Sequence, residues 1–530
     1  MKIKDNDHPA TFLYGEDILT VGLALKLASG KISGYLGKNS SERIIKSQEI
    51  VANIVANHQI VYGVNTGFGP LCTSVISESD TKKIQLNLLK SHSVGVGKPI
   101  ETELAKLMLI LKVHALAKGY SGIALETLDR IIWHIKMDII PVVPSQGSVG
   151  ASGDLAPLAH LFLPLVGHGK VCYKGRTVEM AALFQEFGMA PLELGAKEGL
   201  ALINGTQFIA AHAVRVIQRL QNCLDNADLI AAMNLEAMLG SMSSFSPELH
   251  SLRPYPGTLY VAKRMRMIIG KSQIVQSHKN CSRLQDPYSL RCIAQVHGAS
   301  RNAWLHLKEL LHIELNSVTD NPIILDDGRT ISGGNFHGQP LAMALDYVTV
   351  AAAELGNIAD RRIYLSLSDS IEGLPKLLMR ETGLNSGFMI PQYTTAALVS
   401  ENKSFCFPAS ADSIPTSLGQ EDHVSMGSIS ARKALMVIDN LEKILGIELL
   451  CAAQGFDFRK PLRSGGIIDA CHDAIRTSIP FAETDQFMSH EMNKAIAFVR
   501  KGTMIGISHK VAKRLKIDLK NEYDELFGIY

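Results

Sequence analysis

One stretch of the chain combines small residues with a hydroxyl group in a pattern that could change its own backbone. Gly147-Ser148-Val149-Gly150-Ala151-Ser152-Gly153-Asp154 has a glycine at every third position, which is typical of a tight loop. A P-loop is excluded because no Gly-Lys-Ser/Thr follows, and a nucleophile elbow because Asp154 stands where Gly-x-Ser-x-Gly needs glycine. A structural turn or an anion-binding loop stays open beside a chemical role.

The residue types in this loop suit a reaction of the chain with itself. The amide nitrogen of Gly153 can attack the carbonyl carbon of Ala151 and close a five-membered ring, because both residues are small. One water leaves from the ring, and a second leaves when Ser152 loses its β-hydroxyl. An exocyclic methylidene group remains, so the product is an electrophile made from the chain.

Six further motifs accompany this loop in order along the chain. They are Tyr62-Gly63-Val64-Asn65-Thr66-Gly67-Phe68-Gly69, Ser91-His92, Asn204-Gly205-Thr206-Gln207, Gln285-Asp286-Pro287-Tyr288-Ser289-Leu290-Arg291, Gly333-Gly334-Asn335-Phe336-His337-Gly338 and Gln420-Glu421-Asp422-His423-Val424-Ser425-Met426. With the loop, they resemble the motifs of the aromatic amino acid ammonia-lyases, and most closely those of the histidine-using branch. The resemblance implies a 4-methylidene-imidazol-5-one (MIO) group formed autocatalytically from Ala151-Ser152-Gly153, the 151–153 tripeptide, with no external cofactor.

An amino acid substrate needs a partner for its carboxylate. Arg291 offers a planar guanidinium that suits two parallel hydrogen bonds to a carboxylate, although a surface ion pair is the alternative for a single arginine. Asn204 could donate to the same carboxylate or to the MIO oxygen, while Asn-Gly-Thr by itself is an ordinary turn sequence. The resemblance places Arg291 and Asn204 at substrate-anchoring positions, Gln285 beside the MIO group, and Phe336 as an aromatic residue packed near it.

Two tyrosines, Tyr62 and Tyr288, are candidates for acid–base chemistry. A free tyrosine has a pKa of roughly 10, so a tyrosine acting as a base near neutrality needs positive charge nearby. Arg291 follows Tyr288 by three residues and could supply that charge. The resemblance implies that Tyr288 removes the β-proton and that Tyr62 assists at the amine. Half-buried packing is the alternative for both side chains.

His92 and Glu421 bear on the choice of substrate. Imidazole needs one donor and one acceptor, and a neutral histidine together with a carboxylate can satisfy both nitrogens. Phenylalanine would leave both groups unpaired, and such mismatches can discriminate by roughly 10⁴–10⁵. The resemblance places Ser91-His92 and Glu421 with the histidine-using branch, since phenylalanine-using relatives usually have glutamine at the latter position. It implies conversion of L-histidine to trans-urocanate and ammonia, the first step of histidine degradation, with addition of the substrate amine to the electrophile.

Two alternatives to this interpretation stay open. The chain could act on tyrosine or phenylalanine, as an ammonia-lyase or an aminomutase of the same family. It could also be a non-catalytic helical scaffold that keeps the fold without a mature MIO group. The products formed from a panel of amino acids distinguish the first alternative from a histidine-using enzyme. The intact mass of the chain distinguishes the second alternative from an enzyme with a mature MIO group.

The elements that must position these residues are predicted to be mainly helical. Leucine, methionine and alanine recur at helical spacing over 104–115 and predict an amphipathic helix. A helix is also expected over 78–91, and Val171–Val178 is typical of a small hairpin. Alanine-, leucine- and glutamate-rich stretches predict long helices over 209–239, 299–315, 341–366 and 429–451.

The lead-in to the glycine loop is not typical of a central strand. Pro141 and Pro144 precede the loop, and proline cannot donate to a sheet ladder. The sequence therefore predicts a mainly α fold. A smaller mixed N-terminal domain over residues 1–205 carries the MIO loop, and residues 206–530 form a long central helical bundle with C-terminal helices.

Composition narrows the class of protein further. The 530 residues include 53 basic and 51 acidic side chains, a balance that provides no electrostatic footprint for nucleic acid or for an anionic membrane. Eight cysteines without a Cys-x-x-Cys pair indicate neither a disulfide framework nor a zinc ribbon, and no set of side chains has metal-ligand spacing. Asp228, Asp346 and Glu354 interrupt the longest apolar helices, and the first residues lack a signal-like apolar segment. We expect a cytoplasmic enzyme of a small-molecule substrate, and the resemblance implies a homotetramer with active sites shared between subunits.

Overall fold

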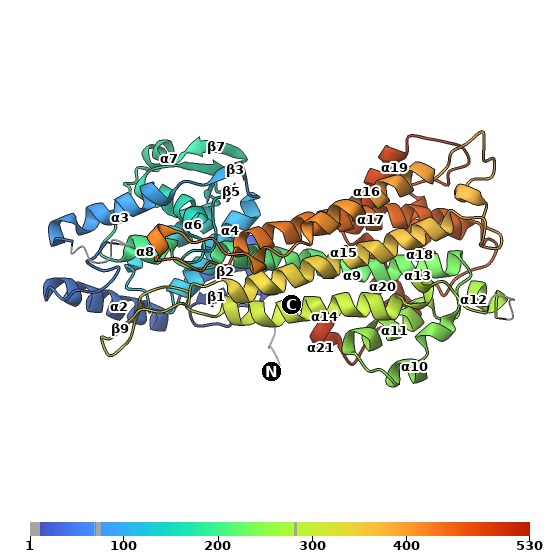
Figure 1. Ribbon diagram of the computed structural model, residues 1–530, viewed down its shortest axis with the longest axis horizontal. Helices are drawn as coiled ribbons and strands as arrows, with labels where there is room; N and C mark the ends of the chain where they lie inside the picture. The colour runs from blue at the N-terminus through green and yellow to red at the C-terminus, as the bar shows by residue number, and fades with distance from the viewer. Residues whose placement is uncertain (1–10, 68, 70–75, 280–283) are drawn as a thin grey trace. The chain divides into compact units, whose positions relative to one another are not determined.

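The computed structural model describes residues 11–67, 69, 76–279 and 284–530 (Figure 1). The mainly α fold predicted from the sequence is confirmed. The chain forms two compact units, each assembled from three segments. Unit 1 consists of Met1–Arg215, Glu309–Leu345 and Pro408–Arg432, and unit 2 of Val216–Lys308, Asp346–Phe407 and Lys433–Tyr530. The division into domains over 1–205 and 206–530 stays a prediction.

Unit 1 is the mixed part of the fold. Its helices are α1 (Val21–Ala28), α2 (Lys38–Ala56), α3 (Glu78–His92), α4 (Thr102–Leu116), α5 (Leu125–Met137), α6 (Leu155–Phe162), α7 (Met180–Phe187) and α8 (Glu198–Ile203). Its strands are β1 (Thr11–Tyr14), β2 (Ser33–Leu36), β3 (Val96–Pro99), β4 (Ile140–Pro141), β5 (Pro144–Gln146), β6 (Lys170–Tyr173), β7 (Arg176–Glu179), β8 (Ile323–Ile324) and β9 (Thr330–Ile331). The predicted helix over 78–91 is therefore confirmed as α3.

The sheets of unit 1 are small. Strand β1 pairs with β2 in parallel, β3 pairs with β5 and β8 with β9 in antiparallel fashion, and β4, β6 and β7 form a three-stranded sheet in that order. The predicted hairpin is the β6–β7 pair, in which Val171 lies opposite Val178. Pro141 and Pro144 lie in β4 and β5, which are both edge strands. The expectation that no central strand precedes the loop is confirmed.

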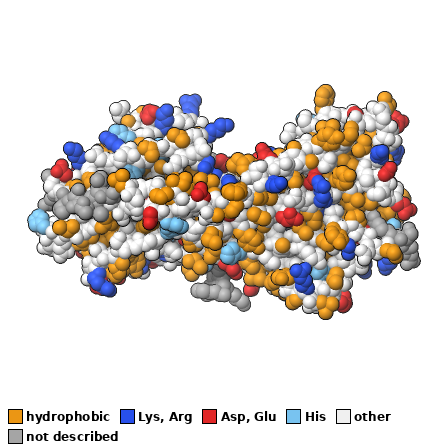
Figure 2. All heavy atoms as spheres, in the orientation of Figure 1, with side chains coloured by type: hydrophobic (Ala, Val, Ile, Leu, Met, Phe, Trp, Pro, Cys, Tyr) orange, Lys and Arg blue, Asp and Glu red, His pale blue; other side chains and the backbone are white. Residues whose placement is uncertain are grey.

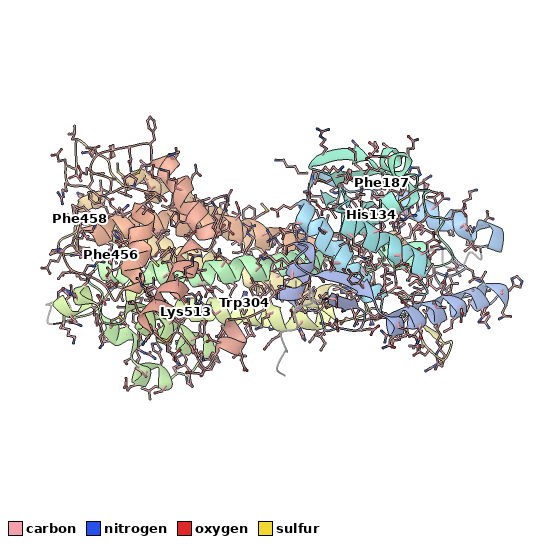
Figure 3. All side chains as sticks on the ribbon, turned by 180° about the vertical axis from the view of Figure 1, so that it is seen from behind. His134, Phe187, Trp304, Phe456, Phe458 and Lys513 are labelled. Carbon is pink, nitrogen blue, oxygen red and sulfur yellow. The ribbon has the colours of Figure 1, made fainter. Side chains whose placement is uncertain are left out.

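Helix α4 differs from its prediction in one respect. The apolar spacing predicted an amphipathic helix, but every residue from Leu107 to Leu116 is buried, including Lys112 and His114. Helices α1 and α5 and strand β4 pack around it, so it has no wide solvent-facing side. On α5, the ring of Trp133 makes T-shaped contacts with the rings of His134 and Phe187, with centroids 5.1 and 5.5 Å apart. Figure 3 labels His134 and Phe187.

Unit 2 is helical. Four long helices, α9 (Gln207–Ala237), α14 (Ile293–Leu315), α15 (Gln339–Ser366) and α17 (Gly427–Asp457), each begin or end in unit 1 and confirm the four predicted long helices. The other helices are α10 (Pro247–Ser251), α11 (Pro256–Ile269), α12 (Gln273–Ser277), α13 (Tyr288–Arg291), α16 (Met389–Phe405), α18 (Ile467–Arg476), α19 (Met488–Arg500), α20 (Thr503–Leu515) and α21 (Asp524–Phe527). In the core, the indole of Trp304 on α14 donates to the Ile217 carbonyl on α9 at 2.9 Å (Figure 3).

Helix α15 is, among the described residues, the one helix whose length and apolar composition would allow it to cross a membrane. Within its most apolar window, 72% is buried inside the protein. Asp346 on this helix lies 3.2 Å from the ammonium of Lys433. The helix therefore packs as a core element of the fold.

A buried ion network joins three helices of unit 2. The carboxylate of Asp228 on α9 lies 2.6 Å from Arg301 and 2.9 Å from Arg264, and it accepts from the Nδ1–H of His297 at 2.9 Å. Burial by itself raises the pKa of Asp228, but the neighbouring Arg301, His297 and Arg264 outweigh it and hold that pKa well below its usual range. Asp228 is fully buried, so it must stay paired.

Removal of this carboxylate should destabilise the protein. We expect Asp228→Asn to lower the free energy of unfolding by about 3–5 kcal/mol, because Arg264 and Arg301 lose the fully buried one of the two carboxylates that pair with them, Asp225 being the other. Urea unfolding followed by circular dichroism measures the change. The matched control is Glu42→Gln, which breaks an exposed pair with Lys38 at 3.7 Å and should change little. Equal effects of the two substitutions would contradict the assigned role of Asp228.

Candidate active site

The glycine loop takes a backbone shape that few residues tolerate. Gly150 and Gly153 have φ angles of 86° and 82°, and Ser152 between them has a φ of 47°. A serine in the left-handed region is uncommon. Ala151 and Ser152 are half-buried, whereas Gly153 is buried. The serine is thus held in a sharp turn at a partly accessible place.

Gly205 holds the loop from the other side. A Cβ on Gly153 would lie 2.1 Å from the Gly205 carbonyl oxygen, so a side chain there is excluded. The amide of Gly205 donates to the Ser152 carbonyl at 3.1 Å, and the amide of Asp154 donates to the Gly205 carbonyl at 2.8 Å. The 151–153 tripeptide is therefore anchored to the turn at Asn204-Gly205.

Asp154 joins the loop to helix α9. One of its carboxylate oxygens accepts from the amides of Phe208 and Ile209 at 3.0 and 3.1 Å, in the first turn of that helix. Burial raises the pKa of Asp154 to about 7, although these two hydrogen bonds oppose the shift. The side chain is fully buried. This role of Asp154 was not predicted from the sequence.

Three helices of unit 1 bring the predicted site residues together. Helices α3, α6 and α8 pack against one another. His92 is the last residue of α3, and Asn204 caps the carboxyl end of α8. The 151–153 tripeptide is followed by Asp154, the N-cap residue of α6. The β3–β5 pair connects the chain after His92 with the chain before the loop.

Asn204 is buried, and its polar atoms are only partly used. Its side-chain nitrogen donates to the Asn321 carbonyl at 3.1 Å, while its side-chain oxygen has no hydrogen-bond partner among the described residues. Its backbone carbonyl accepts from the ammonium of Lys112. One amide hydrogen and the side-chain oxygen of Asn204 are thus available for a ligand.

His92 and Glu421 lie within electrostatic reach of each other. Burial lowers the pKa of His92, while a backbone hydrogen bond at Leu88 and the negative charge of Glu421 oppose the shift. Glu421 accepts from the hydroxyls of Thr416 and Ser417 at 3.1 and 2.5 Å. The lowered pKa favours neutral His92 near pH 7, and the Glu421 carboxylate, which two hydroxyl groups hold in place, lies within electrostatic range of it.

The segment that follows Glu421 is bonded directly to the glycine loop. The amide of Met426 donates to the Val149 carbonyl at 2.9 Å, and the hydroxyl of Ser428 donates to the Ser148 carbonyl at 2.7 Å. A Cβ on Gly150 would lie 2.2 Å from the Ser425 hydroxyl. The candidate specificity residue and the candidate electrophile are thus parts of one packed structure.

Tyr62 and Phe336 lie in turns of unit 1. The Tyr62 hydroxyl accepts from the amide of Gly69 at 3.3 Å. A Cβ on Gly63 would lie 2.5 Å from the side chain of Leu200, so this turn packs against α8. Phe336 is half-buried, and the ring of its neighbour His337 stacks on His423, with centroids 5.5 Å apart.

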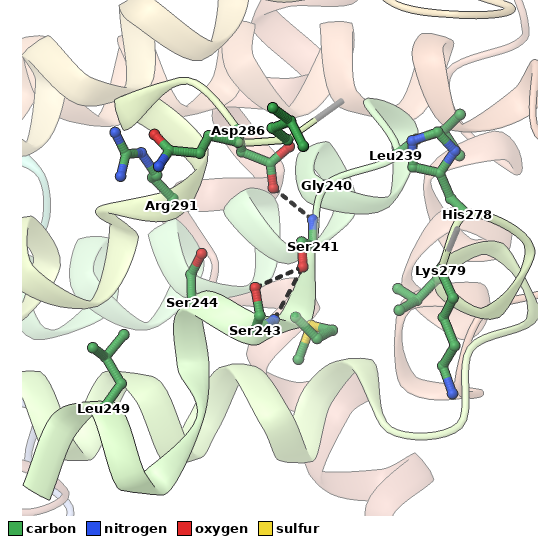
Figure 4. A pocket seen from close by; sticks show the side chains of 14 residues that line it. Leu239, Gly240, Ser241, Ser243, Ser244, Leu249, His278, Lys279, Asp286 and Arg291 are labelled. Atoms are coloured by element: carbon green, nitrogen blue, oxygen red, sulfur yellow. Dashed lines mark hydrogen bonds between the residues drawn. The ribbon is translucent and has the colours of Figure 1, made fainter. Parts of the chain in front are cut away.

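Two of the three remaining predicted residues line a pocket in unit 2. Gln285 and Arg291 line a cavity of about 610 Å³, together with Asp286, which accepts from the Ser241 amide at 2.6 Å (Figure 4). The guanidinium carbon of Arg291 lies 4.5 Å from the ring centroid of Tyr288, as the spacing of three residues predicted. Tyr288 is 72% exposed.

This pocket is suited to an anion. The Nε atom of Arg291 has no hydrogen-bond partner among the described residues. In Figure 4 Arg291 lies on one side of the pocket, and His278 and Lys279 lie on the other. Two basic side chains, Arg291 and Lys279, therefore line a cavity that is large enough for an amino acid.

The predicted site residues thus fall into two sets, one in each unit. Unit 1 holds Tyr62, His92, Ala151, Ser152, Gly153, Asn204, Phe336 and Glu421, and unit 2 holds Gln285, Tyr288 and Arg291. The contacts of Lys112 and Asp154 with the site were not predicted from the sequence. Their signal was a charged residue inside an apolar run and an acidic residue directly before a helix. No group of three or more metal-ligand side chains occurs in the described part of the chain.

Comparison with known proteins places these motifs in a family. A family model described as aromatic amino acid lyase matches residues 19–477, which is most of the chain. The chain belongs to the aromatic amino acid lyase family. The motifs that resembled this family from Tyr62 to Met426 all lie within the matched range.

Other members of the aromatic amino acid lyase family are similar over nearly the whole length. A histidine ammonia-lyase of Natranaerobius thermophilus is 43% identical, with 91% of this chain and 95% of the relative covered. The crystal structure of histidine ammonia-lyase from Trypanosoma cruzi has a TM-score of 0.88 and 38% identity, and covers 98% of this chain and 97% of its own. A tyrosine aminomutase from Streptomyces globisporus has a TM-score of 0.89 and 35% identity, with 95% and 99% covered.

Asp154 should make stability depend on pH. Its folded pKa of about 7 lies above the unfolded value of roughly 3.9. Between pH 4 and 7 the folded chain therefore binds more protons than the unfolded chain, and stability falls as pH rises. Asp154→Asn keeps an oxygen for the Phe208 and Ile209 amides and removes this titration. We expect the variant to gain thermal stability relative to the native chain between pH 5 and 7.5. Parallel melting curves at all pH values would contradict this assignment.

Proposed function

We propose that the protein acts as a histidine ammonia-lyase, which eliminates ammonia from L-histidine and releases trans-urocanate. The observation that carries this proposal is the neutral His92 beside Glu421, on a segment bonded to the glycine loop. The two groups provide a hydrogen-bond donor and an acceptor suited to an imidazole ring. The similarity to histidine ammonia-lyases over most of the chain supports the same substrate.

The residues of the loop fit an MIO group. Ring closure needs a sharp bend at Ser152 and a small residue after it, and the chain has a φ of 47° at Ser152 and a tightly packed Gly153. The amide of Gly205 is aimed at the Ser152 carbonyl oxygen, which is retained in the ring. When formed from the 151–153 tripeptide, the MIO group supplies an electrophile that makes the substrate amine a better leaving group.

The other residues bind the substrate and move its protons. Arg291 binds the carboxylate through its guanidinium, with Asn204 as a second donor. Tyr288 accepts the β-proton, and the guanidinium of Arg291 lies over its ring. Tyr62 assists at the amine. Positioning of these groups supplies much of the rate.

Two further residues complete the proposed site. Phe336 packs beside the 151–153 tripeptide, and Gln285 lies next to the reacting group. His92 and Glu421 hold the imidazole ring of the substrate, and a substrate with a phenyl ring leaves both of them without a partner.

We further propose that four copies assemble in the cytoplasm and that each active site combines loops from three subunits. In support, Tyr347, Val350 and Tyr364 expose large hydrophobic side chains on one face of α15. Ile390 and Tyr393 do so on α16. Figure 2 shows hydrophobic side chains gathered over the long helices of unit 2. Such a surface suits burial against further copies of the chain.

Ser152→Ala should abolish formation of the electrophile. Without the β-hydroxyl, the second water cannot leave, so the intact mass should lack that loss and turnover of L-histidine should nearly vanish. The matched control is Ser148→Ala in the same loop, which should retain the loss of two waters. Mass spectrometry of intact chains and urocanate absorbance measure both outcomes. Retained turnover in Ser152→Ala would contradict the proposed chemistry.

A panel of amino acids tests the substrate. We expect urocanate from histidine and little coumarate or cinnamate from tyrosine or phenylalanine. Glu421→Gln should lower kcat/KM for histidine by roughly 10²-fold or more, because a neutral amide replaces the charged acceptor. Turnover of tyrosine without histidine would favour the aminomutase or tyrosine-using alternative. A native chain that loses no water would favour the scaffold alternative.

A further inference from the structure

Lys112 is a buried cation under the candidate active site that the proposed mechanism does not use. It lies on α4 with 1% of its surface exposed. Its ammonium donates to the backbone carbonyl of Asn204. The nearby carboxylate of Asp320 is already paired with Lys197 at 2.7 Å. Among the described residues, Lys112 therefore has a peptide carbonyl rather than a carboxylate as its direct partner.

Such a placement costs stability. Burial lowers the pKa of Lys112 to about 7, and Lys197 adds to the shift, whereas Asp320 and Asp154 oppose it. A folded protein with an unpaired buried ammonium is less stable than one with an apolar side chain of the same length at that position. Lys112 is thus a poor choice for stability alone.

The carbonyl that Lys112 contacts is linked to the 151–153 tripeptide by a single peptide group. The Asn204 carbonyl and the Gly205 amide belong to that group. The same amide donates to the Ser152 carbonyl at 3.1 Å. A donor on the oxygen of a peptide group polarises it and strengthens its N–H as a donor. The positive charge of Lys112 therefore acts on the Ser152 carbonyl oxygen through polarisation of one peptide group.

This oxygen gathers charge during the second dehydration. The Cα–H and Cβ–Oγ bonds of Ser152 break, a Cα=Cβ double bond forms, and the proton and hydroxide leave as water. As the Cα proton departs, negative charge develops on the adjacent carbonyl oxygen. A donor already aimed at that oxygen stabilises the charge without reorganisation.

We propose that Lys112 is a positioning residue for the maturation of the 151–153 tripeptide. It holds and polarises the peptide between Asn204 and Gly205, so that the Gly205 amide stabilises the charge on the Ser152 carbonyl oxygen. This inference rests on the proposed function, because it requires the tripeptide to lose two waters.

The test follows with time the intact mass of full-length chains that are synthesised in the unfolded state, before any water is lost, and are then allowed to fold. Lys112→Met keeps the length of the side chain and removes the charge, and we expect it to lose two waters about tenfold more slowly than the native chain or worse. Lys112→Arg keeps a charged donor and should mature at close to the native rate. The control Lys106→Met removes a lysine from the same helix, where it pairs with Asp138 at 2.7 Å, and should mature normally.

Thermal unfolding separates this role from a structural one. Lys112→Met should melt at or above the native temperature although it matures slowly. If it fails to fold, Lys112→Gln replaces it, since glutamine retains a neutral donor for Asn204, and we again expect slow maturation.

Each remaining outcome decides between the two proposals. A native chain that never loses two waters would overturn the proposed function and this inference with it. A native chain that matures while a folded Lys112→Met or Lys112→Gln matures equally fast would overturn this inference alone. The same conclusion follows if Lys112→Arg folds but matures as slowly as Lys112→Met.

Discussion

The close approach of Gly153 and Gly205 is the constraint on which the candidate site in unit 1 depends. A side chain on Gly153 would overlap the Gly205 carbonyl, and Gly205 has a φ of 133° that favours glycine. Only this approach lets the two backbones exchange hydrogen bonds. Asp154, which follows Gly153, is the N-cap residue of α6, and its side chain accepts from two amides in the first turn of α9. The loop, α6 and α9 therefore take their mutual orientation from one backbone contact.

Two buried clusters, one in each unit, hold their charged groups differently. In unit 2, Asp228 is surrounded by Arg264, Arg301 and His297, so the charge is paired and the network adds rigidity. In unit 1, burial brings the pKa of both Lys112 and Asp154 to about 7, and their direct partners are backbone groups. Strongly shifted buried groups concentrate at functional sites. The polar residues beneath the glycine loop thus fit a role in chemistry better than a role in stability.

The sequence predicted the long helices well because apolar spacing and composition are local signals. Each of the helices α9, α14, α15 and α17 begins and ends within six residues of its predicted range. The site residues were found through their motifs, and their roles stay predictions. Lys112 was missed because its partner, Asn204, lies 92 residues away. A similar reason explains why α4 was expected to be amphipathic, since α1, one of the elements that cover it, is distant in sequence.

The fold alone does not select the substrate. A histidine ammonia-lyase and a tyrosine aminomutase match this chain with TM-scores of 0.88 and 0.89, so the same backbone accompanies different activities. The choice of substrate must then depend on a few side chains and on the hydrogen bonds that fix their positions. Glu421 accepts from Thr416 and Ser417, and Ser417 has a left-handed φ of 51°. The turn thus fixes one carboxylate within electrostatic range of His92, and under the proposed function this acceptor is where the selectivity resides.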